Sequence, residues 1–171
     1  MLNAQTSSRG TIVDELFARF GAELFTLQHC ADNTPTLWVD ADHLLNVLRF
    51  LKPHYPMLYD LFAIDERLRE HRAGQPSADF SVVYHLLSFS PVAEIRLKVA
   101  LIEPGEIPTA CGVWPNANWY EREAWDMFGI RFSGHPNLRR ILLPPTWEGH
   151  ALRKEHPARA TEMEPFSLSE E

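Results

Sequence analysis

The residues from 118 to 157 hold many of the chain's side chains that can carry chemistry. They read NWYEREAWDMFGIRFSGHPNLRRILLPPTWEGHALRKEHP. Glu121, Glu123 and Asp126 offer carboxylates for acid–base work, and three histidines and several arginines follow them. A set of this composition predicts an active site, a metal site, or a charged surface that binds a partner.

The spacing of these groups does not match a metal site. His150 lies fifteen residues after His135, and His156 lies six residues further on. Glu121 and Glu123 are two residues apart, so they would face different sides of a helix. The chain contains no HExxH sequence and no CxxC pair, which are the spacings that typically bind zinc.

Independent catalysis by the cluster is not predicted either. Arg122 and Asp126 lie four residues apart, so on a helix they can pair with each other. Asn118 followed by Glu121 resembles a capping box, which gives Glu121 a structural role. The chain has no nucleophile elbow, no GxGxxG and no phosphate loop. We therefore expect this chain itself to bind no cofactor.

Asp126 and the arm after it indicate a docking surface instead. The predicted helix ends near Asp126, where the macrodipole disfavours a carboxylate, so Asp126 needs a cation from this chain or from another. Repeated prolines break the following arm, which carries Trp147 and four cationic residues: Arg139, Arg140, Arg153 and Lys154. Tryptophan and arginine are favoured interface anchors. The pattern favours binding to a partner, and the alternative is that these residues pack on their own domain.

The hydrophobic pattern predicts an α+β domain in which helices cover one sheet. The expected helices are 12–20, capped by Thr11, a second that begins at Asp40 or Asp42 and stops before Pro53, and 119–128. The expected strands are 23–30, 36–40, 57–65, 80–89 and 94–102. After Gly134, only LRRILL (138–143) has a pattern that can pair as a strand.

Length and charge limit the classes of protein. The 171 residues fit one domain, 1–134, followed by a C-terminal arm, 135–171. A formal net charge of −7 argues against a nucleic-acid partner. No secretory signal and no run of about 20 apolar residues occurs, so we expect a soluble chain that reaches a membrane only through another subunit. Cys30 and Cys111 are expected to be reduced, buried thiols.

The cluster closely resembles the signature of the C subunit of respiratory complex I, the proton-pumping NADH:quinone oxidoreductase. That signature runs roughly E-R-E-x-x-D-x-F-G-I-x-F-x-G-H-P, then L-R-R-I, then G-H-P-L-R-K. The matching residues are Glu121, Arg122, Glu123, Asp126, Phe128, Gly129, Ile130, Phe132, Gly134, His135, Pro136, Leu138, Arg139, Arg140, Ile141, Gly149, His150, Leu152, Arg153 and Lys154. Ala151 stands where the family usually has proline, and Glu155 stands where aspartate is common.

The resemblance extends to other segments. MLYDLFAIDERLREHRAGQPSADFSVVYHLLS and PNANWYERE are similar to the form in which the C subunit is fused to the D subunit. HPARATEMEPFSLSEE resembles the join that leads into the D part. The chain is thus most like the N-terminal part of the fused C/D form.

The resemblance implies a two-layer fold with helices on a mixed β-sheet, plus an extended Pro-rich C-terminal arm that runs along the D subunit. It implies a place in the peripheral arm, on the cytoplasmic side of the bacterial inner membrane. FMN, iron–sulfur clusters and quinone would bind to partner subunits. The implied partners are the D subunit, which is part of the same polypeptide in the fused form, and neighbours such as the B and I subunits.

The resemblance also makes the cluster a partner interface without a catalytic role. The candidate interface residues are Glu121, Arg122, Glu123, Asp126, His135, Arg139, Arg140, Trp147, His150, Arg153 and Lys154. Two alternatives stay open. One is a homologous subunit of a membrane-bound hydrogenase or a ferredoxin-dependent complex. The other is a stand-alone enzyme that uses Glu121, Glu123 or His135.

Overall fold

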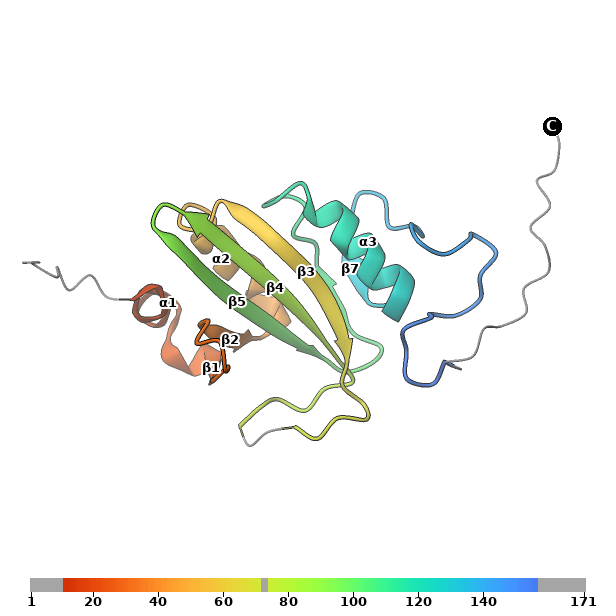
Figure 1. Cartoon of the computed structure of the whole chain (residues 1–171), viewed down its shortest axis with the longest axis horizontal. Helices are drawn as coiled ribbons and strands as arrows, with labels where there is room; N and C mark the ends of the chain where they lie inside the picture. The colour runs from red at the N-terminus through yellow and green to blue at the C-terminus, as the bar shows by residue number, and fades with distance from the viewer. Residues whose placement is uncertain (1–10, 72–73, 157–171) are drawn as a thin grey trace, which may run out of the picture.

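The computed structural model describes residues 11–71 and 74–156 (Figure 1). This part of the chain contains three α-helices, one short 3-10 helix and seven strands. In chain order they are α1 (Ile12–Phe20), the short 3-10 helix η1 (Ala22–Leu24), β1 (Phe25–Gln28), β2 (Thr36–Val39), α2 (Ala41–Leu51), β3 (Met57–Asp65), β4 (Phe80–Phe89), β5 (Val92–Leu101), β6 (Glu106–Pro108), α3 (Ala117–Phe128) and β7 (Arg131–Ser133). None of the described helices is long and apolar enough to cross a lipid bilayer.

Five strands form one mixed sheet in the order β1-β2-β5-β4-β3. β2 pairs with β5 in parallel, and the other pairs are antiparallel. The predicted α+β fold and the β4–β5 hairpin are therefore confirmed. A second sheet of two parallel strands, β6 and β7, was not predicted. Each of its strands has only three residues, which is too short for a periodic pattern to show.

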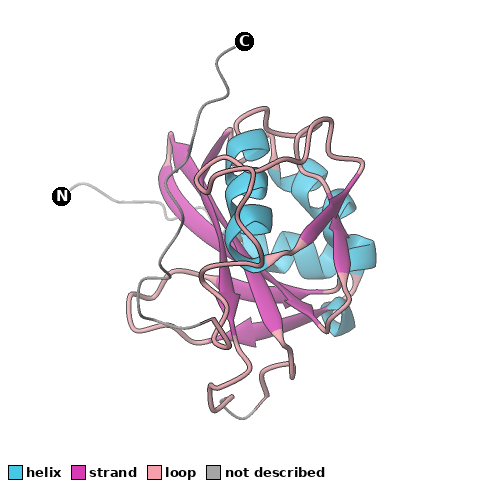
Figure 2. Ribbon diagram, turned by 90° about the vertical axis from the view of Figure 1, so that its right-hand side faces the viewer, coloured by secondary structure: helices cyan, strands magenta, loops and turns pink. Residues whose placement is uncertain are grey.

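The main sheet has one face buried under helices (Figure 2). Along β4 and β5 the side chains alternate between the two faces, as a pleated strand requires. Those that face the helices form one core with the apolar side of α2; they include Val82, Tyr84, Leu86, Ile95, Leu97, Val99, Leu44 and Leu48. The opposite face carries His85, Arg96 and Lys98 and has no described helix over it (Figure 1).

The helix ends show where the local sequence signals hold and where they fail. Thr11 and Asp14 form a capping box at the start of α1, as the Thr11 cap predicts. α3 begins at Ala117, and its N-cap residue is Asn116. The predicted capping box of Asn118 and Glu121 is therefore wrong, because the Glu121 carboxylate binds another segment.

α3 protects the sheet edge formed by β3. The side chain of Asn116 donates to the Leu58 carbonyl at 2.9 Å, and the Tyr120 hydroxyl donates to the Tyr59 carbonyl at 3.2 Å. Unpaired edge carbonyls are satisfied in this way, so a neighbouring chain cannot extend the sheet at this part of β3.

We predict that Tyr84→Phe stabilises the full-length protein. Tyr84 is fully buried, and its hydroxyl has no hydrogen-bond partner among the described residues. An unpaired buried polar group costs about 1–3 kcal/mol, so its removal should raise the free energy of unfolding by about 1 kcal/mol in urea denaturation. The matched control is Tyr120→Phe, which loses a hydrogen bond to Tyr59 and should destabilise slightly. A larger loss for Tyr84→Phe than for the control would contradict the prediction.

Candidate functional site

The Asp126 carboxylate holds the start of the arm against α3. One oxygen accepts the backbone N–H groups of Ile141, Leu142 and Leu143 at 2.8–3.0 Å. The other accepts Arg140 at 2.6 Å. Burial favours the neutral acid, but these bonds outweigh it and hold the pKa of Asp126 below its usual range. The predicted cation for Asp126 is thus present within this chain.

The C-terminal end of α3 receives donors from the arm. The Asp126 carbonyl accepts His150 Nδ1 at 2.9 Å, the Met127 carbonyl accepts the Leu152 N–H at 3.0 Å, and the Phe128 carbonyl accepts Arg153 Nε at 2.6 Å. These carbonyls have no partner inside the helix, so the arm acts as the helix cap.

Gly129 makes this cap possible. Its φ of 80° is left-handed, which glycine adopts most easily. A Cβ here would also lie 2.6 Å from both Arg153 and His150. Any other residue at 129 would strain the backbone and displace the Arg153 and His150 side chains from their present positions.

Arg122 fixes the arm from the side of α3. Its guanidinium donates to the carbonyls of Arg139 and Arg140, at 3.1 Å each. The same guanidinium lies over the Trp119 ring, 5.0 Å from its centroid. The predicted pairing of Arg122 with Asp126 is wrong, because Arg140 reaches Asp126 from the arm.

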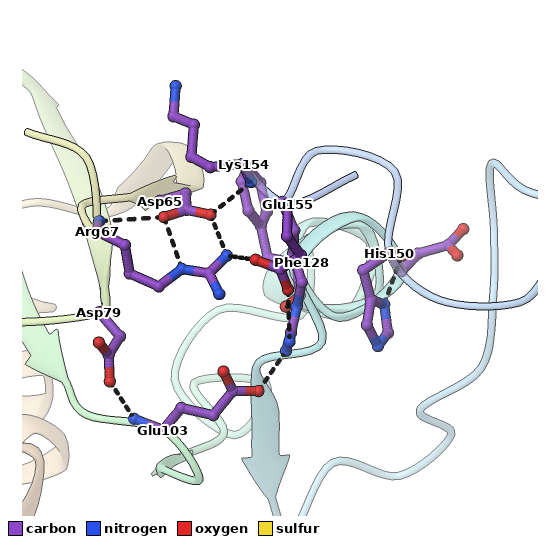
Figure 3. Close-up of polar contacts among 10 residues, drawn as sticks. Asp65, Arg67, Asp79, Glu103, Phe128, His150, Lys154 and Glu155 are labelled. Carbon is purple, nitrogen blue, oxygen red and sulfur yellow. Dashed lines mark hydrogen bonds and ion pairs between the residues drawn. The ribbon is translucent and has the colours of Figure 1, made fainter. Parts of the chain in front are cut away.

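Residues 153–155 of the arm are held by charged side chains after β5 and at the end of β3 (Figure 3). The Asp65 carboxylate accepts the Lys154 N–H at 2.8 Å and is ion-paired with Arg67, which also pairs with Glu155. Arg153 pairs with Glu103 at 2.8 Å. The arm is therefore tied to α3 and to two loops of the domain at once.

Glu121 forms a separate buried site at the middle of α3. Its carboxylate accepts the Thr109 hydroxyl at 2.5 Å and the Ala110 N–H at 2.6 Å. Burial raises the pKa of Glu121, and these hydrogen bonds only partly oppose the rise. The result is a link between α3 and the segment after β6.

Cys111, Glu121 and His135 are the one group among the described residues whose ligand atoms lie close enough for a metal, all within 4.8 Å. The geometry of His135 opposes that use. Its Nδ1 accepts the Asn137 N–H at 3.0 Å, so Nε2 carries the proton and donates to the Asn118 carbonyl at 3.2 Å. No lone pair then faces the other two ligands. The donor set fits a hydrogen-bonded network better than a metal ion.

The structure separates the eleven candidate residues into two classes. Seven are buried or half-buried with side chains bound within the chain: Glu121, Arg122, Asp126, His135, Arg140, His150 and Arg153. Trp147 is half-buried as well; its carbonyl accepts from Arg140, but its indole N–H has no hydrogen-bond partner among the described residues. Glu123, Arg139 and Lys154 are exposed, and among the described residues none of their side chains has a hydrogen bond or ion pair. An interface role for any of the eleven stays a prediction.

Two elements of the site were not singled out from the sequence. LRRILL does not form a strand, because its N–H groups bind Asp126 instead. Asp65 and Arg67 were assigned to a strand end and a loop, although they hold the arm. The only signal for them is a charged run directly after an apolar strand.

A family model described as respiratory-chain NADH dehydrogenase, 30 Kd subunit, matches residues 37–162. Relatives named as the C/D subunit of NADH-quinone oxidoreductase include one from Pseudomonas aeruginosa, 60% identical over 163 residues, and one from Methylococcus capsulatus, 54% identical over 171. These matches cover 92% and 97% of this chain but 27% and 29% of the relatives. The chain thus spans less than a third of the relatives' length.

Two solved structures share the fold. One is a trypsin-resistant fragment (1–134) of Nqo5, with a TM-score of 0.65, 23% identity, and coverage of 74% of this chain and 96% of that one. The other belongs to a membrane-bound sulfane sulfur reductase, an archaeal respiratory membrane complex. Its TM-score is 0.68 at 23% identity, with 86% and 84% covered. At such identity the likeness establishes the fold alone.

We predict that Asp126→Asn releases the arm. An amide cannot accept all of these N–H groups and the guanidinium, so one partner of a buried ion pair is left uncompensated. Such a loss costs about 3–5 kcal/mol. Hydrogen–deuterium exchange of the full-length protein should show faster exchange at Ile141, Leu142 and Leu143. Glu123→Gln, on the exposed side of the same helix, is the control. Unchanged protection of these three amides would contradict the prediction.

Asp65 should make stability depend on pH in acid. Burial favours its neutral form, but hydrogen bonds from Arg67 and the Lys154 N–H prevail and lower the pKa of Asp65 from 3.8 to about 2. The unfolded chain then binds more protons between these values, so the stabilisation is present above the unfolded pKa and lost as pH falls through the folded one. We expect a loss of about 2 kcal/mol.

The test for Asp65 is urea denaturation of the full-length protein across this acid range. Asp65→Asn should flatten the profile, whereas Asp42→Asn, an exposed control on α2, should not. Parallel profiles for the native protein and Asp65→Asn would contradict the assignment.

Proposed function

The chain belongs to the family of the respiratory-chain NADH dehydrogenase 30 Kd subunit, and from that premise we propose that it is a non-catalytic peripheral subunit of a proton-translocating NADH:quinone oxidoreductase. Relatives at 54–60% identity are named as the C/D subunit of NADH-quinone oxidoreductase. They favour this assembly over a hydrogenase or a ferredoxin-dependent complex. The chain's contribution would be to dock onto the D part and help to assemble the complex.

The burial and internal hydrogen bonds of the carboxylates support a structural role. Glu121 and Asp126 are both fully buried, and both are hydrogen-bonded to the chain itself. Neither can meet a substrate from solution without breaking the contacts that hold the segment after β6 or the arm. A stand-alone enzyme built on Glu121 or His135 is therefore the weaker proposal.

The observation that carries docking is the exposed face of α3. Trp119 is 60% exposed, although a large aromatic side chain gains most from burial. Glu123 lies one turn further on the same side of the helix, and Arg139 lies beside Arg122, which stacks on Trp119. We call Trp119, Glu123 and Arg139 the α3 face. An aromatic anchor flanked by charges of both signs that have no ion pair within the described residues suits a protein partner.

The wider assignment follows from the same proposal. Electrons would pass from NADH through FMN and iron–sulfur clusters to quinone, all bound by partner subunits. The partners would be the D subunit, fused or separate, and neighbours such as the B and I subunits. The chain would lie on the cytoplasmic side of the bacterial inner membrane, where those subunits hold it. Residues 135–171 would act as the docking arm of the 1–134 domain.

We predict that Trp119→Ala lowers the amount of assembled complex. Loss of a central aromatic anchor typically costs about 2–4 kcal/mol of binding, which is roughly 30-fold or more in affinity. The measurement is a pull-down of the tagged full-length protein from native membranes, with flavin- and NADH-binding subunits quantified in the eluate. Ile102→Ala removes another exposed apolar side chain, one that is not part of the α3 face, and is the matched control.

Two outcomes of this pull-down would overturn the proposal. Recovery of the native chain alone under gentle extraction would contradict its membership of the complex. Recovery with a nickel–iron hydrogenase subunit in place of the NADH-binding subunits would assign the chain to a hydrogenase assembly instead. Equal recovery of Trp119→Ala and Ile102→Ala would exclude the α3 face as the anchor.

A further inference from the structure

One face of the main sheet has no described helix over it (Figure 1). This face carries a group of exposed apolar side chains. Register places Met57 opposite Leu87, Phe62 opposite Val83 and Phe89 opposite Val92, all on this face. The Tyr59 ring joins them, because it packs on His85 at 5.2 Å. We call this surface the open sheet face. Its large apolar residues are Met57, Tyr59, Phe62, Phe89 and Val92.

These five side chains are between 37% and 81% exposed. They come from three adjacent strands, so they form a surface of one rigid sheet. Single exposed apolar residues are normal, but several large ones on one face of a sheet favour a binding surface. The paired strands beneath also keep the group in a fixed shape, which lowers the entropy cost of binding.

A buried lysine lies in the same row of the sheet. Phe62 is opposite Val83, Val83 is opposite Lys98, and Lys98 is opposite Trp38. The Lys98 ammonium lies 4.0 Å from the centroid of the Trp38 ring, and its one acceptor among the described residues is Gln28 Oε1 at 3.4 Å. Lys98 is only 9% exposed. An ammonium has three donors, so this one is poorly satisfied.

The other basic side chains of the open sheet face already contact carboxylates. Arg96 pairs with Asp32 at 2.7 Å, and His85 contacts Glu94 at 2.9 Å. Lys98 has no carboxylate within ion-pair distance in the described part of the chain. It lines a cavity of about 240 Å³ whose walls also include Arg69 and Glu66.

Glu66 is the nearest alternative partner for Lys98, and it is already engaged. Its carboxylate accepts the Ser81 hydroxyl at 2.6 Å and pairs with Arg69 at 3.4 Å. Burial lowers the pKa of Lys98, since the charged form has lost water. A carboxylate that entered the cavity would stabilise the charged form of Lys98 and accept from its remaining N–H donors.

We propose that the open sheet face binds an apolar protein surface that inserts one carboxylate side chain beside Lys98, and that this surface belongs to the D part of the assembly. The inference rests on the proposed function. In the relatives the matched segment accounts for less than a third of the polypeptide. A tethered partner of that size is at high effective concentration, so it is the favoured occupant of an apolar face.

The test uses the native assembly with the photoreactive residue p-benzoylphenylalanine in place of Phe62. After irradiation, cross-linked peptides are identified by mass spectrometry. The proposal expects peptides from the D part. The same probe in place of Trp119 reports on the α3 face, and a probe in place of Ile102 is the exposed control.

The outcomes separate this inference from the proposed function. If the probe at 62 gives no cross-linked peptides while the probe at 119 does and redox subunits co-purify, the inference is contradicted and the proposed function is supported. Cross-links from 62 to another subunit would overturn the choice of occupant. If neither probe gives cross-linked peptides and no redox subunits co-purify, the proposed function is contradicted as well.

The proposed carboxylate of the partner is tested by removing the positive charge of Lys98. Lys98→Met keeps an apolar chain on Trp38 and should lower the cross-linking yield at 62 by about tenfold, since one paired charge is lost. Arg96→Met is the matched control, because Arg96 is already paired with Asp32. Equal yields for the two variants would overturn the role of Lys98.

Discussion

A carboxylate near the C-terminal end of a helix sets the course of the described part of the arm. The helix dipole and burial both disfavour the charge of Asp126. Three successive N–H groups and the Arg140 guanidinium offset that cost. To supply them, the arm must turn around the end of α3, and this turn brings His150 and Arg153 to the helix carbonyls. One unfavourable charge thus specifies the path of about fifteen residues, much as a buried polar group specifies register elsewhere.

The internal pairing of these charges also determines which side chains remain at the surface to contact partners. Most charges of the cluster are satisfied inside the chain. Among the described residues, large exposed apolar side chains remain at the surface, together with Glu123, Arg139 and Lys154, which have no ion pair there. Trp119 on α3 and Phe62 on the sheet are examples of these apolar side chains. Interface energies come mainly from such buried aromatic anchors. The arrangement is consistent with an assembly subunit whose polar groups shape the fold and whose apolar groups recognise neighbours.

Much of the fold could be predicted because its signals are local. The spacing of apolar residues predicted α1, α2 and β3, and alternation predicted the β4–β5 hairpin. β6 and β7 could not be predicted, since their pairing depends on a long-range contact between two three-residue segments. The same distinction applies to the arm. The local sequence predicted that Asp126 needs a cation, but that Arg140 is this cation, and that Asp65 binds the arm, depends on tertiary contacts.

The central claim is that the buried carboxylates build the assembly and take no part in its chemistry. NADH:quinone turnover of the purified complex that carries Asp126→Asn, divided by the amount of assembled complex, tests this most directly. The account predicts that less complex is recovered and that each complex turns over at the native rate. A normal amount of complex with turnover abolished would contradict it.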